Sequence, residues 1–314
     1  MAKKSWLHGL KVMAAATLAF CLTLVPTANV SADAKGMQAF KEAYMATSAS
    51  DKNVDVSVTL YGPTFRAEMD LNGTAKSNGA AWLGGVLNWS NTNVSSGVTT
   101  QRDIPVYINH AADRVTFYGK TNNVWYKSDL QGMPMWIMNV LNSRDNNIRT
   151  ANISAVRDVH LLSEKNGQQQ MSVILDGQKM AALVNANDSN DKQFATYLAR
   201  AMEKTDLECV WVVEKETRDT ITISLDLTNL MRNYAREVLD GSYHSEITLT
   251  PEEVDFYKTI GYYCNLTFYF NRIGQFNNDS FQQAYNYGKE AQKTTQEGNV
   301  LEQLRAEAVA STVK

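Results

Sequence analysis

Residues able to do chemistry are few in this 314-residue sequence, and they are scattered along it. Apart from His8, the histidines are His110, His160 and His244, and none stands in an HExxH motif or at the spacing from cysteine that a zinc site needs. We therefore expect surface or hydrogen-bonding roles for them. The sequence also lacks a GxSxG nucleophile elbow, a P-loop and a GxGxxG motif after a strand. These observations predict no catalytic residue, no metal site, no cofactor and a protein that is not an enzyme.

Two further sets of residues come nearest to a site. Asp226, Glu237 and Asp240 could supply a carboxylate pair, but nothing in the sequence fixes their separation, so solvated surface is the expected role. The letters LGGVL at residues 83–87 contain two glycines but open no helix and lack a lysine. A kinked strand, or a hairpin around the two glycines, explains them better than a phosphate loop. An enzyme that uses unrecognised carboxylates stays open as a third hypothesis.

The stretch QGMPMWIMNVLNS, residues 131–143, instead concentrates large and adaptable apolar side chains. Met135 and Met138 lie three residues apart, which favours one or two helical turns over a strand. Methionine is unbranched and polarisable, so it conforms to irregular or variable partners. Two interpretations of Met133, Met135, Trp136 and Met138 stay open. They form a plug in the core beneath a sheet, or a lid over a lipid-binding cavity between sheet and helices.

The beginning of the chain predicts a secretory signal peptide at residues 1–34. A basic start is followed by an apolar stretch at residues 12–25 and by a small-x-small cleavage site that ends at Ala34. We expect cleavage after Ala34, with Ala32 as the alternative, and hence a periplasmic or extracellular protein. Cys21 follows a bulky phenylalanine, which disfavours the rival interpretation of a lipid-modified cysteine.

The rest of the composition excludes several classes of protein. The net charge is −3 and no basic patch runs along the sequence, so a nucleic-acid partner is not expected. No further apolar stretch is long enough to cross a bilayer. Cys209 and Cys264 fall on predicted strands with one strand between them, which separates them by ~10 Å and favours two buried thiols over a disulfide. Composition does not predict the oligomeric state.

Apolar and polar residues alternate through most of the mature sequence. Residues 53–61, NVDVSVTLY, place apolar side chains at every second position, and FRAEMDLNG at residues 65–73 repeats the pattern after a Gly-Pro turn. Such alternation indicates antiparallel strands with one buried face. Further strands are predicted at 80–90, 104–110, 113–120 and 123–129, in hairpins at 156–177 and 207–228, and at 262–271.

Helical spacing appears between these strands. Helices are predicted at residues 36–49 and 191–204, near Leu230 to Gly241, and at 250–261, where Thr250 and Glu253 have the spacing of a capping box and Gly261 would follow the last turn. After Asn278 the chain is polar and helix-prone with a weak apolar stripe, so a marginal or mobile tail is expected. The pattern predicts one α+β domain with a single curved antiparallel sheet and helices packed against it.

The order of these elements resembles the LolA/LppX-like family of bacterial envelope proteins, which includes the outer-membrane lipoprotein carriers. The resemblance spans most of residues 36–275 and is carried by FRAEMDLNG, by IPVYINHAADRVTFYGKTNNVWYKSDL and by LECVWVVEKETRDTITISLDLT. The hairpin FYGKTNNVWYK is the segment that most resembles the family. The chain departs from the carriers by its added helices near 228–260, by its polar tail and by the lack of a lipobox.

The resemblance implies an unclosed β-barrel whose apolar concave face is capped by helices and binds acyl chains. The implied segments are the signal peptide, a LolA-like domain at 35–278 and a polar tail at 279–314. The implied partner is a lipid, another acyl-chain ligand or a lipoprotein. Peripheral contact with a membrane is compatible with this, and the protein would act as a carrier or as a sensor. The alternative is a structural or regulatory interaction module whose concave face is plugged by its own helices. The residues expected to line the apolar cavity are Phe65, Met69, Phe117, Trp125, Met133, Met135, Trp136, Met138, Trp211, Leu225 and Phe268.

Overall fold

The structure is a computed structural model that describes residues 34–76, 80–92, 97–111, 114–129, 155–183, 192–263, 265–271, 278–294 and 296–297. Its strands are β1 (Lys52–Tyr61), β2 (Phe65–Ala75), β3 (Ala81–Thr92), β4 (Thr99–Ala111), β5 (Arg114–Thr121), β6 (Val124–Asp129), β7 (Val156–Lys165), β8 (Gln168–Leu175), β9 (Leu207–Glu214), β10 (Thr220–Asp226), β11 (Asn265–Asn271) and β12 (Gln296–Glu297). Its helices are α2 (Ala34–Ala49), α5 (Gly177–Leu183), α6 (Lys192–Glu203), α7 (Thr228–Tyr243), α8 (Pro251–Tyr263) and α9 (Asn278–Thr294).

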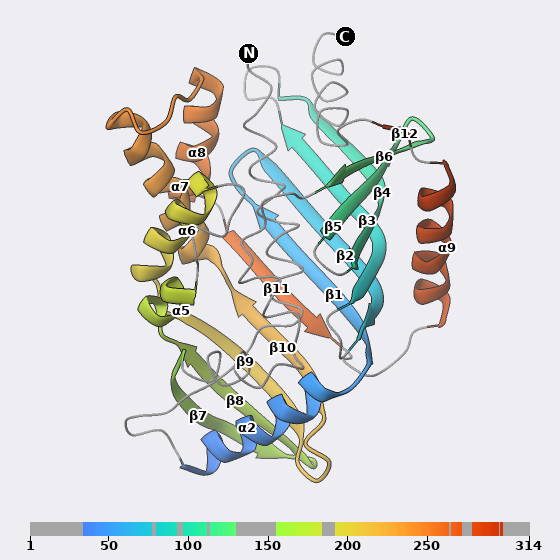
Figure 1. Cartoon of the computed structure of the whole chain (residues 1–314), viewed down its shortest axis with the longest axis vertical. Helices are drawn as coiled ribbons and strands as arrows, with labels where there is room; N and C mark the ends of the chain where they lie inside the picture. Colours follow the sequence, from blue (N-terminus) through green and yellow to red (C-terminus); the bar gives the residue numbers. More distant parts are fainter. Residues whose placement is uncertain are drawn as a thin grey trace.

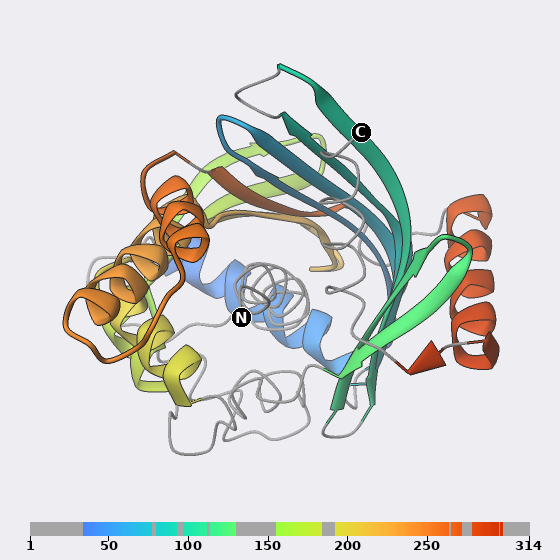
Figure 2. The ribbon, with the colours of Figure 1, turned by 90° about the horizontal axis from the view of Figure 1, so that it is seen from above.

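All the described strands belong to one sheet, which is strongly curved (Figures 1 and 2). The order is β12-β6-β5-β4-β3-β2-β1-β11-β10-β9-β8-β7, and every pairing is antiparallel except the short one between β12 and β6. β7 and β12 stand at opposite ends of this order, so the described sheet is not closed. The predicted fold class, α+β with an unclosed antiparallel barrel, is confirmed.

The strand register aligns one apolar row across nine strands. Each member pairs with the next through its backbone, and the row crosses from one half of the sheet to the other through β11. In order it is Ile104, Leu87, Met69, Val58, Phe268, Leu225, Cys209, Val173 and Val159. The alternation read from the sequence therefore sets one continuous apolar face, because a slip of one residue would turn a strand's apolar side chains to the other face.

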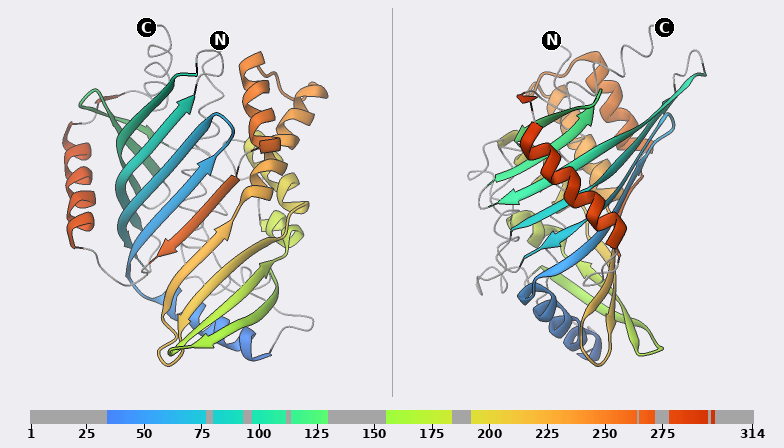
Figure 3. Two further views of the ribbon diagram at one scale, coloured as in Figure 1. Left: turned by 180° about the vertical axis from the view of Figure 1, so that it is seen from behind. Right: turned by 90° about the vertical axis from the view of Figure 1, so that its right-hand side faces the viewer.

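The helices lie on two sides of the sheet. α2 lies inside its curve, and α9 stands against its outer, convex side (Figures 2 and 3). From α2, the Phe40 ring meets the edge of Trp211 in β9, with 4.6 Å between ring centroids and an interplanar angle of 87°. Helices α5, α6, α7 and α8 gather along one flank, where α7 contacts β11 (Figure 2).

Turn and capping signals in the sequence hold in the structure. Asn122 and Asn123 have φ of 49° and 61°, the left-handed geometry that a two-residue hairpin between β5 and β6 requires. At the start of α8, the Thr250 backbone N–H donates to Glu253 Oε2 at 2.6 Å, and the Glu253 N–H donates to Thr250 Oγ1 at 3.3 Å. This is the predicted capping box, with both orphan donors satisfied.

Three local features refine or correct the expectations. Of the two alternatives at residues 80–90 the strand is the one that forms, because β3 is continuous and no hairpin occurs at Gly84 and Gly85. α8 does not stop before Gly261 but continues to Tyr263, because Gly261 lies against α7, where an added Cβ would sit 3.6 Å from that of Ala235. The helix α5 was not predicted. It is only seven residues long, too short to display a clear helical period.

The expected mobile tail is, over residues 278–294, a helix seated on the convex face. An added Cβ at Gly84 would lie 2.8 Å from the Ala284 carbonyl oxygen, and one at Gly288 would lie 2.6 Å from the Tyr107 ring. The two glycines therefore allow α9 and the sheet to approach closely. Burial beneath the helix raises the pKa of the Tyr107 hydroxyl to about 12.

Two findings bear on export and redox state. Among the described helices, none is both long and apolar enough to cross a membrane. Cys209 is a buried free thiol, and burial raises the pKa of its sulfur above the ordinary value. Cys264 and the predicted signal peptide through Asp33 lie outside the described residues.

Candidate functional site

Strands β1 to β5 carry a continuous apolar surface on the concave side of the sheet. We call it the β1–β5 face. The register brings its members together from strands that follow each other in sequence, and all are buried. They are Val54, Val56, Val58, Leu60, Ala67, Met69, Leu71, Leu83, Leu87, Ile104, Val106, Ile108, Val115 and Phe117.

The opposite side of β1 and β2 has a different chemistry. There Ser57 donates a hydrogen bond to Asp70 at 2.6 Å, and Arg66 forms an ion pair with Glu68. Polar side chains thus occupy the alternate positions, and the hydroxyl, carboxylate and guanidinium groups stay at the solvent side. The sheet therefore separates a water-facing surface from an apolar one within single strands.

One end of the β1–β5 face is bordered by a half-buried aromatic pair. Phe65 at the start of β2 stacks on Trp89 of β3, with ring centroids 6.1 Å apart and planes 11° from parallel. Both rings pack against the main apolar core and remain partly exposed. The pair forms a rim where β2 begins and β3 ends.

The other half of the concave face is occupied by helix α2. Trp211 is 1% exposed beneath Phe40, and its indole N–H donates to Thr220 Oγ1 at 2.9 Å. Leu225 in β10 is buried in the same core. Trp211 and Leu225, both predicted to line the cavity, are therefore core residues in the part of the concave face that α2 fills. This part agrees with the alternative of a sheet plugged by its own helices.

Trp125 does not lie on the predicted concave side. It is 1% exposed on the convex side, in a cluster with Tyr107 of β4 and Ala291 of α9. Its ring lies 5.9 Å from that of Tyr287 in the same helix. The segment VWY at residues 124–126 is apolar throughout, so the sequence pattern does not predict which of its side chains lie on the concave face.

The remaining predicted site residues lie in different places. Phe65, Met69 and Phe117 all belong to the concave side, the first at the rim and the others buried. The backbone of Phe268 pairs with both Val58 and Leu225, at the centre of the apolar row. Met133, Met135, Trp136 and Met138 lie outside the described residues, so the lid and the plug both stay predictions.

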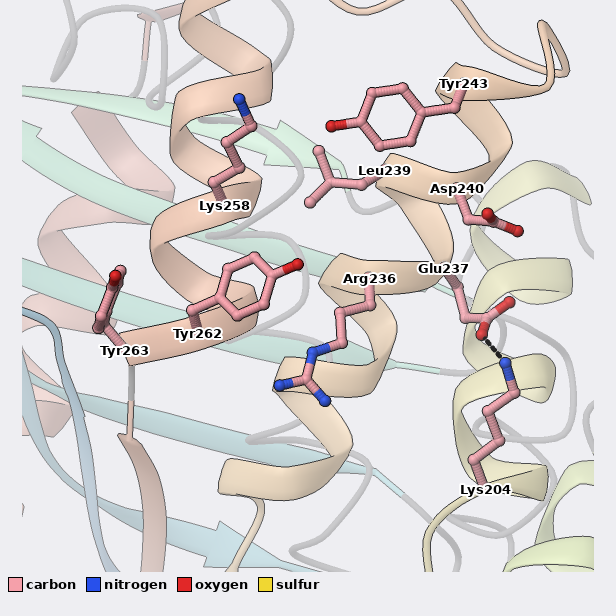
Figure 4. A pocket seen from close by; sticks show the side chains of 9 residues that line it. All are labelled: Lys204, Arg236, Glu237, Leu239, Asp240, Tyr243, Lys258, Tyr262 and Tyr263. Atoms are coloured by element: carbon pink, nitrogen blue, oxygen red, sulfur yellow. Dashed lines mark hydrogen bonds and ion pairs between the residues drawn. The ribbon is translucent and has the colours of Figure 1, made fainter.

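A groove between helices α6, α7 and α8 was missed by the sequence analysis. It has a volume of about 600 Å³, within the usual range of ligand sites. Figure 4 shows Lys258 and Tyr262 of α8 facing Leu239 and Tyr243 of α7 across it. The other lining residues are Lys204, Arg236, Glu237, Asp240 and Tyr263. No local pattern in the sequence indicates this groove, because it depends on how α7 and α8 lie together.

The three carboxylates considered for acid–base chemistry take separate positions. Asp226 accepts a hydrogen bond from the Thr228 N–H at 2.9 Å, at the start of α7. Glu237 pairs with Lys204, and Asp240 lies 3.4 Å from His244 Nε2. Glu237 and Asp240 thus both line the groove but have different cation partners, and within the described part of the chain no three His, Cys, Asp or Glu residues could hold a metal ion.

Comparison with known proteins adds little to this geometry. No protein-family model matches the sequence, and no curated protein matches it. The crystal structure of LprF from Mycobacterium bovis matches 79% of this chain and 97% of its own, at 11% sequence identity and a TM-score of 0.38. A likeness of this degree assigns neither a family nor a function, so the fold rests on the sheet order and register given above.

Proposed function

We propose that the protein is an exported envelope protein that binds an acyl chain, of a lipid or a lipoprotein, on the β1–β5 face. It acts as a carrier or a sensor and does no chemistry on its ligand. The observation that supports this most is the continuity of large apolar side chains across five neighbouring strands of an open sheet, ending at the Phe65–Trp89 rim. Ligand sites are concave and mostly apolar, as this face is.

The energetics favour a long apolar chain over a small polar ligand. Each methylene group moved from water into an apolar environment contributes ~0.8 kcal/mol. The members of the β1–β5 face are all apolar, and buried His110 lies at its end, on the same side of β4 as Ile108, so the face supplies mainly apolar contact. An acyl chain therefore fits its chemistry, and any polar group of the ligand would remain near the rim.

The competing function is an interaction module filled by its own helices. The Phe40–Trp211 contact favours it for the half of the sheet covered by α2. Inside the curve, α2 contacts β7 and β10 and reaches Trp211 of β9. The acyl-chain function requires a ligand on the β1–β5 face, whereas the interaction module requires none. A measurement of bound ligand therefore separates the two functions.

The test is native mass spectrometry of the processed chain, beginning at residue 35 and purified without detergent. We expect mass adducts of lipid that disappear on organic extraction, and binding of one fatty-acid probe by the extracted protein. A chain that is lipid-free as purified and does not bind the probe would contradict the proposal and favour the interaction module.

A matched pair of substitutions places the ligand on one side of the sheet. Trp89 and Trp82 belong to the same strand and are both half-buried, but Trp89 faces the rim whereas Trp82 lies 4.9 Å from Phe281 of α9. We expect Trp89→Ser to raise the dissociation constant of a fluorescent fatty acid roughly tenfold, the equivalent of 1.4 kcal/mol. Trp82→Ser should leave it unchanged. Equal effects of the two variants would contradict binding on the concave side.

A further inference from the structure

Three strongly exposed tyrosines gather at the groove between α7 and α8. Tyr243, Tyr262 and Tyr263 are 67%, 56% and 63% exposed, and the rings of the last two have centroids 6.4 Å apart with planes tilted by 58°. A tyrosine combines an apolar ring with a polar hydroxyl and is enriched where one side of a surface is apolar and the other wet. Such a cluster marks an interaction surface rather than ordinary exposure.

Two cations accompany these rings. The Arg236 guanidinium lies 5.3 Å from the centre of the Tyr262 ring, and Lys258 extends from α8 toward the same groove (Figure 4). Among the ion pairs of the described residues none involves Arg236 or Lys258, and Arg236 donates a 3.5 Å hydrogen bond to the neutral amide oxygen of Asn233. Their charge is therefore available to an anionic partner.

The carboxylates of the groove do not cancel this charge locally. Glu237 is 6% exposed and is paired with Lys204 from α6. Asp240 lies 3.4 Å from His244 Nε2, on the side of α7 away from Tyr262 (Figure 4). The part of the groove near Tyr262 thus presents cations and phenol groups.

The cluster stands beside the rim of the β1–β5 face. Tyr263 comes two residues before Asn265, which pairs with Tyr61 at the end of β1. Tyr61 is itself 46% exposed, and β2 begins just beyond it at Phe65. Figures 1 and 3 both show the turn between β1 and β2 on the same side of the molecule as α7 and α8.

We propose that the α7–α8 groove and its tyrosines form a docking surface for an anionic phospholipid membrane. Arg236 and Lys258 face the lipid phosphates, and the tyrosine rings enter the headgroup layer. Docking in this way sets the Phe65 rim toward the bilayer, so an acyl chain passes between membrane and protein over a short path. The inference deepens the proposed acyl-chain function and rests on it for this last step.

The experiment measures co-sedimentation of the processed chain with vesicles. One set contains phosphatidylglycerol and phosphatidylcholine, and the other contains phosphatidylcholine alone. We expect roughly tenfold stronger partition onto the anionic vesicles, falling as salt is raised. The double variant Arg236→Gln, Tyr262→Ser should weaken that partition about tenfold, because it loses a cation and a ring at the surface.

The control is an equivalent pair on another face. In α9, Lys289 lies 4.5 Å from the centre of the half-exposed Tyr285 ring, so Lys289→Gln with Tyr285→Ser likewise removes one positive charge and one tyrosine ring. It should leave partition unchanged. The proposal is overturned by equal loss in both variants, by equal binding to neutral vesicles, by no vesicle binding, or by binding of free inorganic phosphate without vesicles.

Native mass spectrometry of the same samples separates the two proposals. A double variant that still carries lipid but no longer binds vesicles supports the docking surface and keeps acyl-chain binding intact. A chain that binds anionic vesicles through the groove yet never carries lipid leaves the docking surface standing and contradicts the acyl-chain function. A cooperative unfolding transition in each variant shows that lost binding is not lost folding.

Discussion

Single charged residues tie the helix inside the sheet to the strands around it. Glu164 near the end of β7 accepts hydrogen bonds from Lys215 and from Gln169, the latter at 3.1 Å, and lies 3.4 Å from Lys35 of α2. The hydrogen bond from Lys215, followed by that from Gln169, lowers the pKa of the Glu164 carboxyl from 4.5 to about 2. One carboxylate thus joins α2, the β7–β8 hairpin and the turn after β9.

The lowered pKa predicts an acid-dependent contribution to stability. Because the folded value is depressed, the contribution is fully present above about pH 4.5 and is lost as the pH falls toward about 2. Glu164→Gln should therefore be less stable than the wild type at pH 7, and the difference should shrink across this window. Urea midpoints at a series of pH values test this, with exposed Glu203→Gln as the control. A difference that stays constant with pH would contradict the assignment.

Residue patterns predicted much of the apolar face but not its limits. Strict alternation in β1 and β2 correctly put Met69 on the concave side, as it did Phe117 in β5. It failed for Trp125, where three apolar residues in a row leave the face undetermined, and a helix from the far end of the chain decides it. The groove at Tyr262 could not be foreseen, because it depends on how α7 and α8 lie together.

At the scale of elements, α9 shows why helix formation and helix attachment are separate questions. Its polar composition indicated a helix with a weak stripe, and the helix forms. Its attachment depends on Ala284 and Gly288, small residues that permit close contact with Gly84 and Tyr107. A hydrophobicity pattern gives such residues little weight, because they bury little apolar area. They contribute instead by letting the helix and the sheet pack closely.

This interface predicts the effect of one bulky substitution. Ala284 is 1% exposed against β3, whereas Gln283 beside it is exposed. Ala284→Arg should displace α9 and cost ~1–3 kcal/mol, as overpacking does. Hydrogen exchange should then rise across residues 278–294 and stay unchanged in β7–β10. Gln283→Arg is the control, and equal exchange in the two variants would show that α9 does not depend on this contact.

Across the whole molecule, one strand joins the two halves of the sheet. β11 follows β10 in sequence after the helices α7 and α8, yet it lies between β1 and β10 in the sheet. Local pattern identified it as a strand but could not give its partners, because pairing across about 200 residues leaves no local sequence signal. The resulting face divides into a part filled by α2 and the β1–β5 part, which is where the proposed function lies.

Photochemical labelling can show directly whether an acyl chain binds on the β1–β5 face. A fatty acid with a diazirine near its chain end would be bound to the processed protein, irradiated and located by tandem mass spectrometry. If the acyl chain binds there, we expect labels on Met69, Leu87, Phe117 or their neighbours on the concave side, and we expect excess unlabelled fatty acid to suppress them. Labels confined to the convex side around Trp82 and Trp125, or labelling that excess fatty acid does not suppress, would contradict binding on this face.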